Sequence, residues 1–160
     1  REVGGDDIRS DVGTRARITR HLDLGAGRYE LEAQIGQRLR VLRWLPDDPY
    51  PRAVVQPWPD EPGPTVSDER ISQVVDAILV LGERVATLRG GRLRPDALAV
   101  DPDTADDPGR HLYALASRVP MGQADRYAVL CAPTLAARVD VLLDAVATLT
   151  AIVDFQLSGD

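Results

Sequence analysis

The sequence predicts an α+β fold in which an antiparallel β-sheet comes first and a bundle of about four helices follows. Three observations lead to this prediction. Apolar and polar residues alternate along much of residues 12–56, as in half-buried strands. Prolines at four positions between residues 57 and 64 exclude a helix interior and a central strand there. Beyond them, apolar residues recur every three or four positions, which is the spacing of amphipathic helices.

The first two strands are predicted at residues 12–24 and 28–35. The Gly25-Ala26-Gly27 sequence between them suits a hairpin turn, because glycine readily adopts positive φ. The alternation assigns the polar side chains to one face of the hairpin and the apolar side chains to the other, core-facing side. That inward face is predicted to hold Ala16, Ile18, Leu22, Leu24, Tyr29, Leu31, Ala33 and Ile35.

Gly36 interrupts the alternation, so we expect a bulge or a close backbone approach at this position. A third strand is predicted at residues 37–45. Proline and aspartate at positions 46–49 favour a turn, and a fourth strand should follow at residues 50–56.

The first helix is expected to begin near a capping box formed by Thr65 and Asp68. Gly90-Gly91 should end it, because glycine is the preferred residue just beyond a helix C-terminus. Between these signals one apolar stripe points to the core: Val74, Ile78, Leu81, Val85 and Leu88.

Three further helices follow a polar loop at residues 92–107. Asp107 and Pro108 are typical of an N-cap and first turn, and Pro120 should stop this short helix. Another short helix is expected at residues 123–131, and the last begins at Pro133. Its heptad-spaced stripe could be a coiled-coil seam, but we favour an intramolecular core. The stripe comprises Leu135, Val139, Leu142, Val146, Leu149 and Val153.

These elements divide the chain into a β-sheet part at residues 1–58, a proline-rich connection at 59–66 and a helical part at 67–160. At 160 residues and 44% hydrophobic content, the chain can bury a core and should fold. No apolar run is long enough to span a bilayer, and no signal-peptide pattern is visible at the first residue. We therefore expect a cytoplasmic protein with no membrane partner.

The composition excludes several kinds of chemistry. All 19 basic residues are arginine, so the sequence offers no lysine for a phosphate-binding loop, a Schiff base or a serine-lysine dyad. His21 and His111 lack partners at metal-binding spacing, and the apolar neighbours of Cys131 favour a buried, inert thiol. We expect no enzyme activity, no catalytic residue, no metal and no cofactor.

Gly13 leading the first strand, the Pro49-Tyr50 turn and the amphipathic helices occur in an order that resembles the amino-terminal substrate-binding domain of the ATP-dependent protease Lon. This domain also occurs without the ATPase and peptidase, and we expect a standalone bacterial member. The resemblance implies a PUA-like, partly closed sheet. Because the chain enters the family pattern partway through, the sheet should be incomplete at its N-terminus, with an exposed edge or an uncovered apolar face.

The resemblance also implies a non-catalytic module that recognises unfolded or extended polypeptide. Aromatic residues make up only 4% of the chain, and Trp44, Tyr50 and Trp58 flank turns or the proline-rich connection. These three are the candidate peptide-binding residues, in a groove between the sheet and the first helix, although we favour packing between sheet and helices over contact with a ligand.

Two other functions stay open. An RNA-binding, PUA-like module would use Arg15, Arg17, Arg38 and Arg40 on one sheet face. We disfavour nucleic acid because the net charge is −6 and aromatic residues for base stacking are almost absent from these strands. The chain could alternatively be an oligomerisation subunit that self-associates through its sheet edge or its last helix.

Overall fold

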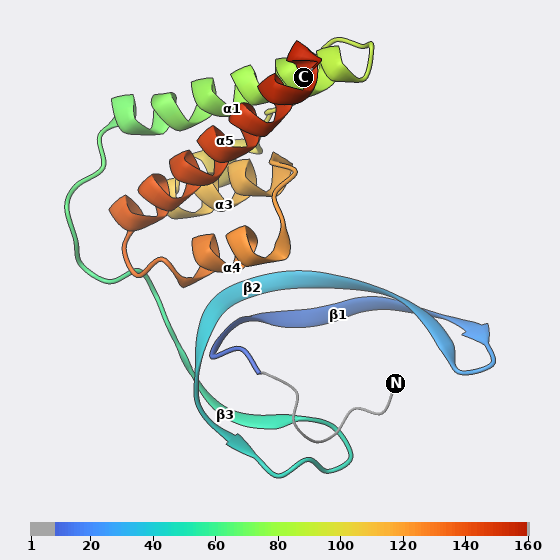
Figure 1. The fold of residues 1–160 in the computed structure, drawn as a ribbon. Coiled ribbons are helices and arrows are strands. Elements are labelled where there is room, and N and C mark those ends of the chain that lie inside the picture. The colour runs from blue at the N-terminus through green and yellow to red at the C-terminus, as the bar shows by residue number, and fades with distance from the viewer. Residues whose placement is uncertain (1–8, 160) are drawn as a thin grey trace. The chain divides into compact units, whose positions relative to one another are not determined.

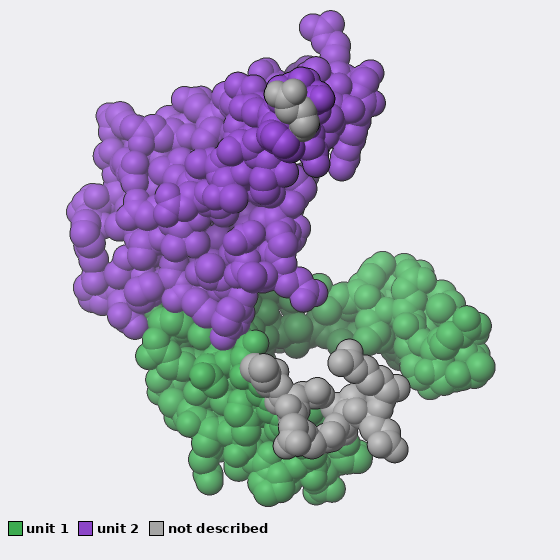
Figure 2. Space-filling model, viewed as in Figure 1, with its two compact units in different colours: residues 1–59 green, residues 60–160 purple. Residues whose placement is uncertain are grey.

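The computed structural model describes residues 9–159, apart from the side chain of Asp103. The chain forms two compact units, residues 1–59 and residues 60–160, which we call unit 1 and unit 2 (Figure 2). Unit 1 contains a partly open antiparallel sheet of three strands, and unit 2 contains the helices (Figure 1). The predicted α+β fold class is therefore confirmed.

The sheet of unit 1 has the order β1-β2-β3, formed by β1 (Val12–Gly25), β2 (Arg28–Leu45) and β3 (Arg52–Pro57). Both pairs of neighbouring strands are antiparallel. The hairpin turn is confirmed, since Gly25, Ala26 and Gly27 all have positive φ, at 78°, 54° and 72°. The Asp23 carboxylate also accepts a hydrogen bond of 2.8 Å from the Gly25 amide.

The prediction of separate second and third strands is wrong, because β2 runs through Gly36 as one strand of 18 residues. The expected bulge is present there. Thr14 pairs with Arg38 and Ala16 pairs with Ile35, so β2 carries one more residue than β1 between these pairs. The expected close approach is also present: a Cβ atom at position 36 would lie 3.4 Å from the Arg15 carbonyl oxygen. A bulge bends a strand without ending it, which explains the continuity.

Unit 2 opens with α1 (Asp68–Leu88), whose N-cap is Ser67 and not Thr65 as the capping-box pattern predicted. The Ser67 side chain makes no cap hydrogen bond to the backbone. It hydrogen-bonds the Glu69 carboxylate instead, and this bond lowers the pKa of Glu69 below its ordinary value. The helix ends as expected, with Gly90 at a φ of 68°.

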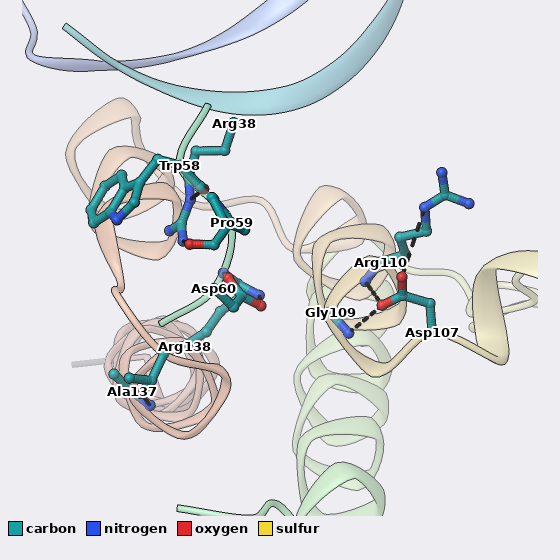
Figure 3. A network of polar contacts seen from close by, with 10 residues as sticks. Arg38, Trp58, Pro59, Asp60, Asp107, Gly109, Arg110, Ala137 and Arg138 are labelled. Atoms are coloured by element: carbon teal, nitrogen blue, oxygen red, sulfur yellow. Dashed lines mark hydrogen bonds and ion pairs between the residues drawn. The ribbon is translucent and has the colours of Figure 1, made fainter. Parts of the chain in front are cut away.

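The remaining helices are α2 (Pro102–Ala105), α3 (Pro108–Arg118), α4 (Gln123–Cys131) and α5 (Leu135–Ser158). The four-residue α2 lies in the segment predicted to be a loop. Asp107 caps α3 as predicted, accepting hydrogen bonds from the amides of Gly109 at 2.9 Å and Arg110 at 3.1 Å (Figure 3). α5 begins two residues later than expected because Thr134 is its N-cap.

The apolar stripe of α5 forms part of the core of unit 2, as we favoured over a coiled-coil seam. Val139, Leu142 and Val146 are each at most 1% exposed. They pack in one cluster with Val74, Ile78 and other residues of α1 and α3. No described helix is both long and apolar enough to cross a membrane.

Unit 2 also buries a charged group. Arg138 of α5 is fully buried, and both of its terminal nitrogens donate hydrogen bonds to the Asp60 carboxylate, from Nη1 to Oδ2 at 2.9 Å and from Nη2 to Oδ1 (Figure 3). Its guanidinium also lies 4.1 Å from the ring centroid of Tyr113. This bidentate pair fixes the first residue of unit 2 to its longest helix.

We expect Asp60→Asn to lower the free energy of unfolding of unit 2 by about 2–3 kcal/mol, because it leaves the buried Arg138 guanidinium without its counter-charge. This loss of unfolding free energy is smaller than that for breaking a fully buried ion pair, because the Asp60 side chain is 35% exposed. Urea unfolding followed by circular dichroism at 222 nm measures the change. Asp140→Asn is the matched control: it removes the partner of Arg70 in an exposed pair of 2.5 Å and should cost less than about 1 kcal/mol. Equal losses in the two variants would contradict this account.

Candidate functional site

An apolar face of the β1-β2 hairpin is exposed. The register pairs Ala16 with Ile35 and Ile18 with Ala33 across the two strands. Tyr29 and Leu31 share this face, because side chains at every second position of a strand point the same way. We call these six residues the hairpin face. Its large side chains are more than half exposed, with Ile18 at 59%, Tyr29 at 58%, Leu31 at 55% and Ile35 at 64%.

The prediction that these side chains point into a core is therefore wrong, and so is the assignment of Tyr29 as a core residue. The periodicity separates an apolar from a polar side over most of the hairpin, but no other strand of unit 1 covers the apolar side. The expectation of an uncovered apolar face, which followed from the resemblance, is confirmed. An apolar strand face of this kind is normally packed against another layer, so its exposure marks a surface for interaction.

The opposite face of the hairpin is polar. Glu30, Glu32 and Gln34 alternate with the apolar residues of β2, and Arg17 is paired with Gln34. Arg20 donates a hydrogen bond of 3.0 Å to the Glu32 carboxylate, which forms a cross-strand salt bridge on this face. The polar face is suited to remain in water, whereas the hairpin face is suited to bind.

One strand carries a register shift that the sequence pattern did not reveal. Ile18 pairs with Ala33 and Arg20 pairs with Glu32, so Thr19 is an extra residue in β1. A one-residue shift transfers the following side chains to the other face. Leu22 consequently pairs with Glu30 on the polar face, contrary to the prediction. His21 and Asp23, which pair with Leu31 and Tyr29, lie on the same side of the hairpin as the hairpin face and border it with polar groups.

Trp58 is buried and stacked on arginines at the end of β3. Its ring centroid lies 4.1 Å from the Arg38 guanidinium carbon and 3.8 Å from that of Arg40. Arg38 Nε also donates a hydrogen bond of 2.9 Å to the Trp58 carbonyl, and Nη2 one of 3.4 Å to the Pro59 carbonyl (Figure 3). Trp58 and Arg38 are only 8% and 7% exposed. This arrangement favours the packing role for Trp58.

Trp44 and Tyr50 are exposed to solvent. Trp44 is 38% exposed, and the Arg9 guanidinium carbon lies 4.9 Å from its ring centroid while Arg9 also binds the Asp47 carboxylate at 2.8–3.0 Å. Tyr50 is 64% exposed in the connection between β2 and β3. The register does not bring the two tryptophans together. Trp44 pairs with Ala53, whereas Trp58 continues the alternate row opposite Arg38, so they lie on opposite faces.

The four arginines proposed for RNA binding do not share one face. Thr14 pairs with Arg38, so Arg38 and Arg40 lie on the same side as Ala16 and Ile18. Arg15 and Arg17 alternate with those residues and lie on the opposite side. The idea of a single basic sheet face is therefore wrong, and Arg38 and Arg40 are engaged with Trp58.

No group of three or more metal-binding side chains occurs among the described residues. Cys131 is half-buried and not fully buried as expected. Among residues 9–159, the hairpin face is the surface best suited to bind a partner.

Comparison with known proteins gives one match. The model of a family described as the ATP-dependent protease La (LON) substrate-binding domain matches residues 2–148. A search of curated proteins found no match.

We expect the double substitution Ile18→Thr and Ile35→Thr to change the free energy of unfolding by no more than about 0.5 kcal/mol per site, because both side chains are mostly exposed. The same change should reduce the fluorescence of the apolar dye 8-anilinonaphthalene-1-sulfonate bound to the folded protein. Leu142→Ala in the core of unit 2 is the contrasting control and should cost about 2–5 kcal/mol. A large stability loss in the threonine variant would mean that the hairpin face is covered in solution.

Proposed function

The chain belongs to the family of ATP-dependent protease Lon substrate-binding domains, and on this premise we propose that it binds unfolded or extended polypeptide through the hairpin face. Substrate-binding domains of this family are non-catalytic modules. We propose recognition without turnover for this chain, in line with the absence of lysine from its sequence.

The observation that carries the proposal is the exposure of Ile18, Tyr29, Leu31 and Ile35 on one face of a paired hairpin. The backbone hydrogen bonds between β1 and β2 hold the strands beneath these side chains in place, so binding need not order the backbone there. Unfolded polypeptide differs from folded protein in exposing apolar side chains, and burying apolar area is a non-directional source of affinity. The hairpin face can therefore accept many sequences.

The edge of β1 supports the same mode of binding. Among residues 9–159, β1 pairs only with β2, so its other edge has no neighbouring strand. An extended polypeptide can add to such an edge through backbone hydrogen bonds while its apolar side chains extend the hairpin face. Arg15 and Arg17 on the opposite side of this strand favour ligands whose outward side chains are acidic or neutral.

We propose Trp44 and Tyr50 as further contacts for polypeptide, since both are exposed aromatic residues of unit 1. The oligomerisation function would use the same uncovered surface to bind a second copy. Sedimentation at several concentrations distinguishes the two, because self-association depends on the concentration of this chain alone.

Binding is tested by fluorescence anisotropy with a labelled, reduced and alkylated protein that cannot fold. We expect saturable binding, and Ile35→Asp should weaken it about tenfold or more, since it places a charge where apolar side chains are buried. Gln34→Asp is the matched control, with the same added charge one residue away on the polar face. It should leave the affinity nearly unchanged.

Circular dichroism should show that both aspartate variants keep the fold. The proposal fails if no binding is detected at high micromolar protein, or if the two variants lose affinity equally. Competition by the native, folded form of the same labelled protein would also count against recognition of unfolded chains.

A further inference from the structure

Unit 2 contains a pocket of about 540 Å³ that belongs to neither the sheet nor the hairpin face. The second half of α1 forms one wall and the segment after α1 forms another. Arg118 at the end of α3, with Val119 and Pro120 just beyond it, closes the pocket. Its apolar lining includes Leu81, Val85 and Leu98. A volume of this size lies within the range of about 300–1,000 Å³ that is typical of small-molecule sites.

Local sequence explains why the pocket exists. The positive φ of Gly90 turns the chain back after α1, and the Gly91 amide donates a hydrogen bond of 2.8 Å to the Ala86 carbonyl. Leu93 then packs directly over Gly82. A Cβ atom at position 82 would lie 3.1 Å from a methyl group of Leu93, so the glycine admits this close approach. The returning segment thus lies along α1 and encloses space beside it.

All the charged residues that line the pocket are positive. Four of its lining residues are arginines and none is acidic, although acidic residues outnumber arginines in residues 60–160. Arg94 forms an ion pair of 3.2 Å with Asp96, and Arg118 donates a hydrogen bond of 3.3 Å to the Ala99 carbonyl. Arg89 and Arg92 form no ion pair or side-chain hydrogen bond with any residue between positions 9 and 159.

We propose that this pocket binds a small amphipathic anion, with an apolar body against Leu81, Val85 and Leu98 and an anionic head group at Arg89 and Arg92. Guanidinium groups bind carboxylate and phosphate through paired hydrogen bonds, and the apolar lining excludes a fully hydrated inorganic ion as the preferred ligand. A carboxylate is the head group we assign. This site goes beyond polypeptide recognition, because it lies in unit 2 and takes a ligand of another class.

The test uses the full chain and decanoate as the probe, with binding followed by isothermal titration calorimetry and by the ¹H–¹⁵N NMR shifts of α1 and residues 89–98. We expect one saturable site per chain. Decanol, which has the same tail without the charge, should bind about tenfold more weakly, since the charge-assisted hydrogen bonds are lost. Decyl phosphate tests the other possible head group: binding that is much tighter than that of decanoate would overturn the assignment of a carboxylate.

Substitutions distinguish the contribution of the arginine charges to decanoate binding from that of the shape of the pocket. Arg89→Gln with Arg92→Gln should weaken decanoate binding about tenfold. Arg70→Gln with Arg84→Gln removes the same charge from the exposed surface of α1, outside the pocket, and should have little effect, because it breaks only exposed ion pairs. Ala86→Leu keeps a good helix former but fills the pocket and should abolish binding. Equal effects of the two double variants would overturn the proposal.

The hairpin face is a second apolar surface of the chain. Decanoate binding by the Ile35→Asp variant tests whether decanoate binds there. This variant should bind decanoate normally while losing unfolded polypeptide. The reverse result, with decanoate lost in Ile35→Asp and retained in Ala86→Leu, would overturn the pocket proposal and leave polypeptide binding intact. A peptide with an apolar residue at its free C-terminus is tested as a competitor of decanoate. If it displaces decanoate and has a lower Kd than decanoate, the pocket is reassigned to the C-termini of polypeptides.

Discussion

The structure depends on the pairing of two buried guanidinium groups, of which that of Arg138 keeps its Nε buried without a hydrogen-bond partner among residues 9–159. Arg38 and Arg138 are the only charged residues buried among residues 9–159. A guanidinium removed from water needs acceptors in a fixed geometry, or its desolvation destabilises the fold. Arg38 finds carbonyl oxygens and an indole ring at the end of unit 1, and Arg138 finds a carboxylate at the start of unit 2. Each arginine therefore fixes the boundary segment of its own unit.

The two units differ in how far they bury their apolar side chains. In unit 2 the amphipathic helices cover one another, and the core cluster is drawn entirely from residues beyond position 73. In unit 1 the described residues form a single three-stranded sheet with no second layer within that unit, and Trp58 is the one described apolar side chain there that is buried. A sheet face without a covering layer keeps its apolar area available, and this is the physical basis for assigning recognition to unit 1.

Sequence reasoning succeeded where the signals are local. The Asp107 cap and the glycines at positions 90 and 91 place helix ends through hydrogen bonds that span a few residues, and the helices they bound were predicted closely. Gly36 likewise marked a bulge, because glycine interrupts the alternation of apolar and polar residues along the strand. Thr19 gives no such signal, since threonine is an ordinary strand residue, so the shift that moves Leu22 to the polar face could not be foreseen.

Features that depend on distant parts of the chain were not predictable. Alternation shows which side chains of a strand share a face, but it does not show whether another layer covers that face. The opposite placement of Trp44 and Trp58 follows from strand register. The arginine-lined pocket was missed because residues 92–107 were interpreted as a polar loop. Leu93 between two arginines was an available sign that this loop folds back onto an apolar surface.

The pairing of α1 with α5 has a consequence for synthesis of the chain. α1 packs chiefly against α5, and their buried residues are separated by about seventy positions. The β1-β2 hairpin joins neighbours and can form as soon as it leaves the ribosome, whereas α1 must wait for the last helix to emerge. Through that interval the nascent chain exposes the apolar stripe of α1, so the core of unit 2 closes only after α5 has been made.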